Sequence, residues 1–156
     1  VIIGNGQSVA EAQQVEILET NLDDWNPEGF PFLCERLFAS QALDVSLTPI
    51  QMKKGRPGFC LSVMAHVQDS QKLKEIILTE TSAIGLRYRS EQRLTLPREI
   101  VEVNTRWGRV TAKKVETPNG SKTYPEYEAC RLIAKKHALP LETVYREVLC
   151  LTDKLS

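Results

Sequence analysis

The sequence lacks the long apolar segments of a membrane protein. No hydrophobic run approaches the roughly 20 residues that a helix needs to cross a bilayer, and the opening Val1-Ile2-Ile3 is followed at once by Gly4-Asn5-Gly6. We therefore expect no membrane span and no signal peptide, and a cytoplasmic location. The 156 residues are 42% hydrophobic, which suffices for one or two globular domains.

The usual ligands of transition metals are also scarce. The two histidines, His66 and His137, are far apart, and the four cysteines (Cys34, Cys60, Cys130 and Cys150) include no C-x-x-C pair. The sequence thus has no recognisable zinc or nickel site, and the cysteines are expected to be reduced, mostly buried thiols.

An excess of charge of one sign is absent as well. Twenty basic and twenty acidic side chains give a net charge of zero, which argues against a general polyanion binder. The charges are nevertheless unevenly spread, because residues 1–50 carry eight acids against Arg36 alone, a net charge of −7, and the rest of the chain carries +7. A basic part is therefore expected to meet an acidic segment.

Hydrophobic periodicity predicts an α+β protein. Residues 1–14 have the composition of a linker from a preceding domain that is missing here, and 15–89 follow the order β-α-β-β-α-β of a ferredoxin-like subdomain. The expected elements are strands at 15–21, 44–50, 59–67 and 84–88, a helix from Asn26-Pro27 to Ala42, and a helix beginning at Asp69-Ser70. Leu33, Leu37 and Phe38 are expected on one face of the first helix, and Leu73, Ile76 and Ile77 on one face of the second.

Residues 90–156 have a different rhythm and are expected to form a small ββαα module. Strand-like runs at 94–103 and 110–115 predict a β-hairpin, and Pro118-Asn119-Gly120 predicts a further turn. Two helices are expected after it, one starting at Pro125 and one after Pro140.

The turn before the third expected strand carries three cations beside glycine, Lys53, Lys54 and Arg56. Glycine lets a backbone approach a ligand closely, and clustered cations suit phosphate groups. The alternative is a solvated loop that only keeps the protein in solution. The strand–GxxxxGK[ST]–helix frame of a P-loop is absent.

The end of the first expected strand carries hard oxygen ligands. Asn21, Asp23 and Asp24 offer an amide and two carboxylates, which suit magnesium or manganese bound to nucleotide phosphates. The alternative is that the two aspartates only stabilise the start of the following helix. The pattern alone does not place these residues beside the basic loop.

Two further pairs are candidates for nucleotide contacts. Glu80 lies at the expected end of the second helix and Arg87 in the expected fourth strand, and Glu126 and Tyr127 begin an expected helix of the second module. Because clefts between modules are common binding sites, we expect both pairs to contribute to one nucleotide cleft. The alternatives are a surface ion pair for Arg87 and ordinary helix-start chemistry for Glu126.

A ferredoxin-like sheet also raises the possibility of RNA binding. That function needs several aromatic side chains on the central strands, whereas the third expected strand, Gly58-Phe59-Cys60-Leu61-Ser62-Val63-Met64, has one. Nucleic-acid binding is therefore a minor alternative.

Four strings in this order, LETNLDDWNPE, MKKGRPGFCLSVM, TETSAIGLR and PEYEACRLIA, resemble the C-terminal domain of the LarC family of nickel-insertion proteins. The resemblance spans Val15 to the C-terminus. It implies a domain of a cyclometallase that depends on CTP and on Mn or Mg, and that inserts nickel into pyridinium-3,5-bisthiocarboxylic acid mononucleotide to form the nickel-pincer cofactor of lactate racemase.

The resemblance further implies a nucleotide, a pyridinium mononucleotide and nickel as partners, and we expect a homo-oligomer. Because His66 and His137 are the only histidines, nickel is expected to be handled with the missing N-terminal part. The alternative function is a non-enzymatic module for nucleotide or RNA binding or for oligomerisation.

Overall fold

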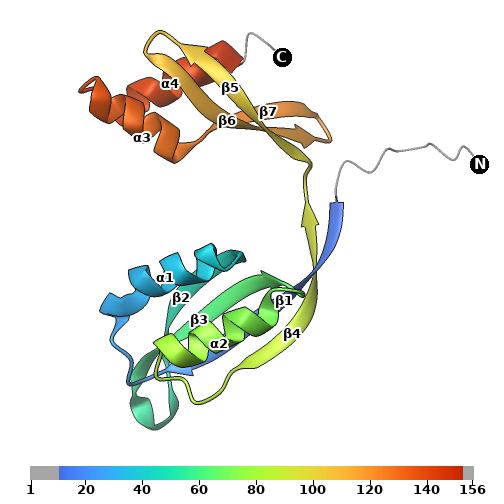
Figure 1. Ribbon diagram of the computed structural model, residues 1–156, viewed down its shortest axis with the longest axis vertical. Coiled ribbons are helices and arrows are strands. Elements are labelled where there is room, and N and C mark those ends of the chain that lie inside the picture. Colours follow the sequence, from blue (N-terminus) through green and yellow to red (C-terminus); the bar gives the residue numbers. More distant parts are fainter. Residues whose placement is uncertain (1–10, 153–156) are drawn as a thin grey trace, which may run out of the picture. The chain divides into compact units, whose positions relative to one another are not determined.

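Two antiparallel sheets and four α-helices make up residues 11–152, which are the residues that this computed structural model describes (Figure 1). Their contacts divide them into two units, Ala12–Arg93 (the N-terminal unit) and 94–152 (the C-terminal unit). No helix in this part of the chain is both long and apolar enough to cross a membrane. Residues 1–10 of the expected linker lie outside the described residues.

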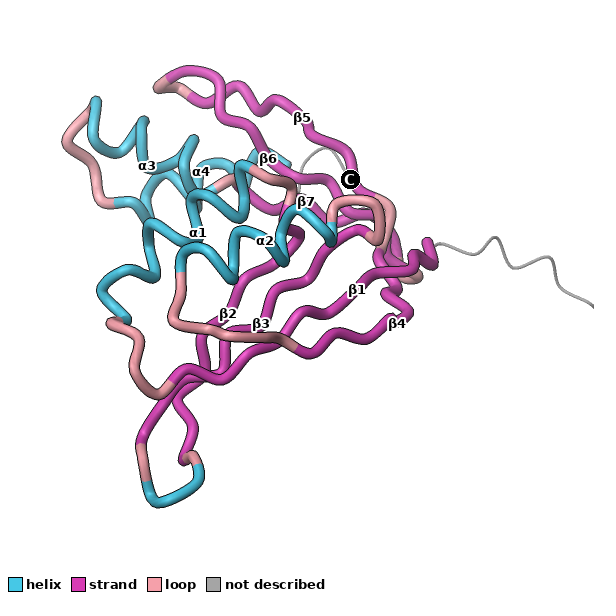
Figure 2. Tube along the Cα trace, turned by 60° about the horizontal axis from the view of Figure 1, so that its bottom comes forward, coloured by secondary structure: helices cyan, strands magenta, loops and turns pink. Residues whose placement is uncertain are grey.

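The N-terminal unit has the predicted ferredoxin-like order. Its elements are β1 (Glu11–Leu22), α1 (Phe30–Ala39), β2 (Ala42–Gln51), β3 (Pro57–His66), α2 (Ser70–Glu80) and β4 (Arg87–Thr95). The strands are arranged β2-β3-β1-β4, and both helices lie on one face of this sheet (Figure 2). The predicted α+β class is therefore confirmed.

Apolar side chains between the sheet and these helices form the first core. The predicted helix positions Leu33 and Leu37 of α1 are buried. The predicted face of α2 is also buried, as are the alternate residues Leu61, Val63 and Ala65 of β3. Phe38 was expected beside Leu37 but is 49% exposed, because α1 buries only the narrower stripe that faces the sheet.

Three element boundaries in this unit were predicted wrongly. The first helix ends at Ala39 rather than at Ala42, because Gln41 has φ 71° and Ala42 already begins β2. β1 begins at Glu11, inside the expected linker, because its polar first residues pair as strand without supplying an apolar pattern. The fourth strand begins at Arg87 rather than Ile84, and Ile84 is fully exposed in the preceding loop. β4 is an edge strand of mostly charged, exposed residues, so apolar alternation could not locate it.

The C-terminal unit is a three-stranded meander with two helices. Its elements are β5 (Arg98–Thr105), β6 (Gly108–Thr117), β7 (Gly120–Pro125), α3 (Tyr127–Lys136) and α4 (Leu141–Thr152). The expected hairpin is present, but β7 was missed because its sequence, GSKTYP, has little apolar content. Both turns use glycine with positive φ, 124° at Gly108 and 111° at Gly120, a region that other residues rarely adopt.

A second core holds this unit together. Val103, Val110 and Ala112 of the sheet are buried with residues of the two helices, namely Cys130, Ala134, Val144 and Val148. The burial of apolar residues at helical spacing in α3 and α4 gives both helices one inward face.

Candidate functional site

The antiparallel pairing of β1 with β3 brings the acidic end of β1 next to the basic turn. Leu22 lies opposite Phe59, so the residues after β1 and those before β3 are neighbours. Arg56 Nη1 lies 3.3 Å from Asp23 Oδ2. The structure thus unites two motifs that the sequence alone left unplaced.

Arg87, at the start of β4, faces the same end of β1. Its Nη2 group donates a hydrogen bond to Asn21 Oδ1 at 3.4 Å, and its Nε group lies 3.2 Å from Glu19 Oε2. The same carboxylate oxygen takes Arg89 Nη1 at 2.6 Å. Hydrogen bonding from Arg89, and the charges of both arginines, lower the pKa of Glu19 against the opposing effect of burial. Glu19 therefore stays ionised and orients both guanidinium groups.

The two lysines of the basic turn keep their charges free. Lys53 and Lys54 are exposed, and neither has a carboxylate partner among residues 11–152. Lys54 has φ 61° and Gly55 φ 70°. These successive left-handed residues turn the chain sharply, and the Met52 N–H donates to the Arg56 carbonyl at 2.8 Å across the turn. The unpaired ammonium groups are thus presented on a short closed loop.

Asp24 and Glu80 have protein partners of their own. Asp24 Oδ1 accepts a hydrogen bond from the Ser82 hydroxyl, and Glu80 Oε1 pairs with Arg36. The Glu80 carbonyl accepts the indole N–H of Trp25 at 3.2 Å. Glu80 therefore ties α2 to α1 and to the loop after β1, which is a structural role in addition to the predicted one.

The predicted metal ligands supply suitable chemistry but no closed ligand set. Within the described residues, no group of three or more His, Cys, Asp or Glu side chains converges. Asn21, Asp23 and Asp24 face three different donors, namely Arg87, Arg56 and Ser82. Two carboxylates and an amide fit a magnesium or manganese ion that takes its other ligands from phosphate and water, as such ions commonly do.

Glu126 and Tyr127 belong to the other unit, at the start of α3. Glu126 Oε1 pairs with Lys113 Nζ of β6, and Tyr127 is 53% exposed. The Glu126 backbone N–H donates to the Thr111 carbonyl at 3.0 Å, which joins the helix start to the sheet. The part that these two residues take in nucleotide binding stays a prediction.

A hollow of about 380 Å³ opens next to the Arg56–Asp23 pair. It is lined by Leu22, Asp23, Trp25, Pro49, Ile50, Pro57, Gly58 and Phe59. Trp25 and Phe59 were not predicted as site residues from the sequence. The available signal was a tryptophan directly after the two aspartates, in a chain that has only two tryptophans.

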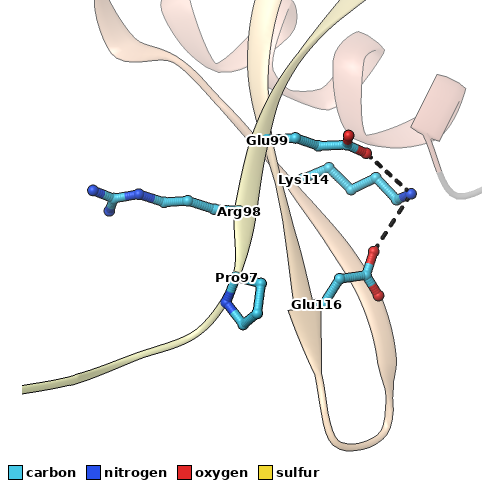
Figure 3. Close-up of a pocket in the computed structure, with 5 residues that line it drawn as sticks. All are labelled: Pro97, Arg98, Glu99, Lys114 and Glu116. Carbon is cyan, nitrogen blue, oxygen red and sulfur yellow. Dashed lines mark ion pairs between the residues drawn. The ribbon is translucent and has the colours of Figure 1, made fainter. Parts of the chain in front are cut away.

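In a smaller hollow of about 220 Å³ in the C-terminal unit, the lining lysine is already paired with two carboxylates. Lys114 Nζ lies 3.3 Å from Glu99 and 3.4 Å from Glu116, while Arg98 points away from both carboxylates (Figure 3). The hydrogen bonds that Lys114 donates to Glu99 and Glu116 raise the pKa of Lys114. Because this lysine is already neutralised twice, the hollow is a poor phosphate site.

The cysteines form no disulfide. All four are free thiols, of which Cys130 is buried, Cys34 and Cys60 are half-buried and Cys150 is exposed. Burial raises the pKa of the Cys34 thiol. The expectation of free thiols is confirmed, but the expectation that they are mostly buried is wrong. Only Cys130 is buried, and Cys150 lies on the outer face of α4.

Comparison with known proteins relates this chain to nickel insertion proteins. A family model described as nickel insertion protein matches residues 1–145. A Desulfotalea psychrophila relative with a nickel-insertion name is 54% identical over 148 residues, covering 95% of this chain and 38% of its own length. In Acetivibrio thermocellus, the pyridinium-3,5-bisthiocarboxylic acid mononucleotide nickel insertion protein is 41% identical over 94% of this chain and 36% of its own.

A solved structure shares the fold over nearly its whole length. It is the apo form of LarC2, the C-terminal domain of a cyclometallase involved in the synthesis of the NPN cofactor of lactate racemase, and it superposes with a TM-score of 0.85 at 38% identity. The match covers 92% of this chain and 99% of that one. The chain thus spans little more than a third of the length of the curated relatives it matches.

Proposed function

Because the chain belongs to the nickel insertion protein family, we propose that it is the CTP- and divalent-metal-binding domain of a nickel insertase. The full enzyme would metallate pyridinium-3,5-bisthiocarboxylic acid mononucleotide and so form the nickel-pincer cofactor of lactate racemase. This extends to the present chain what the names of its relatives state of those proteins.

The observation that carries the proposal is the meeting of cations and hard oxygen ligands at one end of the N-terminal unit. Arg56 and Arg87 lie beside Asp23 and Asn21, and Lys53 and Lys54 add two unpaired charges on the same turn as Arg56. A metal-bound triphosphate still carries about two negative charges, so its site needs both cations and carboxylates.

The proposed reaction of CTP depends on the positioning of its phosphates more than on a nucleophilic side chain of the protein. Transfer of a phosphoryl or nucleotidyl group is catalysed chiefly by alignment and by neutralisation of charge on the phosphate oxygens. Arg56, Lys53 and Lys54 would neutralise and hold the phosphates. Asp23 and Asp24 would hold the magnesium or manganese ion, which supplies further neutralisation when bound.

Arg87 would act from the side of β4, with Glu19 fixing its orientation. Nickel is the substrate metal of the reaction, and its ligands would come from the pyridinium substrate and from parts of the longer relatives that this chain does not cover. Glu80 completes the proposed set of nucleotide contacts in the N-terminal unit, and the roles of Glu126 and Tyr127 in the C-terminal unit stay predictions.

A second candidate is a non-enzymatic module that binds a nucleotide and controls assembly. The free cations of the basic turn would serve such a module equally well. The two functions differ in whether CTP is hydrolysed or only bound, which product analysis of CTP incubated with the chain and its substrates distinguishes.

Calorimetric titration tests the proposal most directly. CTP, UTP, ATP and GTP would each be titrated into the chain with and without manganese. We expect binding of CTP that is tightest with manganese, and weaker binding of the purine nucleotides. If none of the four nucleotides bound under either condition, the proposal would be wrong.

A further inference from the structure

We propose that Ile84 and Gly85, in the loop of residues 81–86 between α2 and β4, receive the nucleoside part of CTP (Figure 2). This inference rests on the proposed function and deepens it. It assigns an apolar contact with the base to Ile84 and the close approach of the ribose to Gly85. The whole loop belongs to the N-terminal unit.

The loop is tied to the end of β1 that carries the proposed metal ligands. On one side of Ile84, the Ser82 hydroxyl donates a hydrogen bond to Asp24 Oδ1. On the other side, the Thr20 hydroxyl of β1 donates to the Gly85 carbonyl at 2.9 Å. Ile84 is therefore fixed between two contacts with the same end of the same strand.

Ile84 is also within reach of a nucleotide that contacts Arg87. Three residues span at most about 11 Å, so the Cα atoms of Ile84 and Arg87 lie no further apart than that. Arg87 donates to the Asn21 side chain at 3.4 Å, which places it beside the proposed metal ligands. A nucleotide whose phosphates contact Arg87 can thus extend its ribose and base over the loop.

The neighbours of Ile84 hold its side chain out into solvent. Ile84 is fully exposed, whereas Ala83 before it and Leu86 after it pack against the first core. The Ala83 N–H also donates to the Thr81 hydroxyl at 3.1 Å. Because these contacts anchor the loop, Ile84 is presented outward in a defined place. An apolar side chain of this kind suits the flat face of a nucleobase, which packs against apolar as well as aromatic groups.

Packing among the described residues does not require glycine at position 85. Gly85 lacks the positive φ that favours glycine. Apart from its two sequence neighbours, a Cβ added there would meet no heavy atom of the described chain within 4 Å. At Gly58, by contrast, an added Cβ would lie 2.7 Å from the Leu22 carbonyl oxygen. The space beside Gly85 is open to a ligand that approaches the backbone closely, which glycine permits.

The proposed contact holds a nucleoside without selecting its base. The side chain of Ile84 has no polar atom, so it cannot form hydrogen bonds with the edge of a base. It would add affinity for a nucleoside triphosphate over a bare triphosphate. This difference separates the role of Ile84 from that of the cations, which bind phosphate in both ligands.

Calorimetry with these two ligands tests the contact. CTP and inorganic triphosphate would each be titrated, with manganese, into the full chain. Ile84→Ala should weaken CTP binding about tenfold, because three carbon atoms lose their contact with the base, and should change triphosphate binding less than twofold. Ile84→Val, which loses one carbon, should lose less. Ile100→Ala is the matched control, since Ile100 is a 74% exposed isoleucine of the C-terminal unit.

Gly85→Ala tests the open space beside the loop. The added methyl group would occupy the place of the ribose, so CTP binding should weaken while triphosphate binding stays the same. The melting temperature should be equal to or above that of the unaltered chain, because alanine at an unstrained position reduces the freedom of the unfolded state. A glycine with only a structural role would give the opposite result, namely a lower melting temperature and normal CTP binding.

Two results would overturn the inference. One is normal CTP binding by both Ile84→Ala and Gly85→Ala when Arg56→Ala binds CTP more weakly, which would place the nucleoside elsewhere and leave the proposed function intact. The other is an equal loss of CTP and triphosphate binding in both loop variants, which would show that the loop shapes the phosphate site. Absence of CTP binding by the unaltered chain would reject the proposed function, and the inference with it.

Discussion

Arg56 lies 3.3 Å from Asp23 although 33 residues separate them in the chain. The pair joins the basic turn before β3 to the acidic end of β1. Arg36–Glu80 and Arg87–Glu19 are further pairs between distant elements of the same unit. The uneven charge distribution of the sequence is therefore resolved partly by pairing at close range, and Lys53 and Lys54 have no carboxylate partner among the described residues 11–152.

Replacing Arg56 tests whether the basic turn binds phosphate. We expect Arg56→Ala to weaken CTP binding by about 1.5 to 3 kcal/mol, the range for a hydrogen bond to a charged group. Arg109→Ala is a matched control, because Arg109 also forms an exposed ion pair, with Glu102 at 3.1 Å in the C-terminal unit. Equal affinities for the Arg56 and Arg109 variants in calorimetry would remove the turn from the site.

The role of Asp23 in metal binding is tested by measuring how much manganese increases the affinity for CTP. Asp23→Asn keeps the shape of the side chain but removes a charge that would bind the cation, so the gain in CTP affinity on adding manganese should shrink. Asp44→Asn is the control, since Asp44 is an exposed aspartate of the same unit that bonds only the neighbouring Val45 N–H in the structure.

The alternative for Asp23 and Asp24 predicts a different result. If the two carboxylates only stabilise the chain before α1, their asparagine variants would unfold at a lower temperature and bind manganese and CTP normally. Thermal unfolding measured beside the titrations separates the two roles.

Glu19 is predicted to act through the arginines that it holds. Glu19→Gln keeps a hydrogen-bond acceptor but removes the charge that orients Arg87 and Arg89. We expect CTP affinity to fall by less than in Arg87→Ala, and the double variant to resemble Arg87→Ala alone. Calorimetry of the three variants measures this coupling, and additive losses would show that Glu19 acts independently of Arg87.

Much of the N-terminal unit could be predicted because its core follows simple periods. Leu33 and Leu37 recur at helical spacing in α1, and Leu61, Val63 and Ala65 alternate in β3. The capping of the chain before α1 was also readable, since Asn26 Oδ1 accepts the Glu28 N–H at 3.1 Å beside Pro27. Both the apolar spacing and the capping residue involve positions close together in the chain, so they can be recognised in a single sequence.

Of the elements held by polar contacts, β4 was predicted with the wrong bounds and β7 was missed. β4 is tied to β1 by the contacts of Arg87 and Arg89 with Glu19, and β7 pairs through its backbone with β6. Neither strand shows the alternation of apolar and polar residues that would reveal it in the sequence. The position of Arg56 beside Asp23 also depends on the β1–β3 register, which couples residues far apart in sequence and so leaves no local trace.

The buried pair of Glu16 and Lys74 is expected to make the stability of the N-terminal unit depend on pH. Lys74 Nζ lies 2.8 Å from Glu16 Oε2, with 17% and 12% of the two side chains exposed, and the Ser70 hydroxyl donates to the same carboxylate. Burial raises the pKa of Glu16, but the hydrogen bonds from Lys74 and Ser70 and the charge of Lys74 outweigh it, so the pKa lies below its ordinary value.

A carboxyl whose pKa is lowered by folding stabilises the folded state when it is ionised. The contribution of Glu16 is therefore complete above the ordinary glutamate pKa of about 4.3 and is lost as the pH falls through its lower folded-state value. Glu16→Gln should reduce the free energy of unfolding by about 1.5 to 3 kcal/mol at pH 7, and the difference from the unaltered chain should shrink below about pH 4. Urea unfolding between pH 3 and pH 7 measures both quantities. Glu35→Gln serves as the control because Glu35 is exposed and has no ion pair with residues 11–152, and a Glu16 variant that lost no more stability at pH 7 than this control would contradict the prediction.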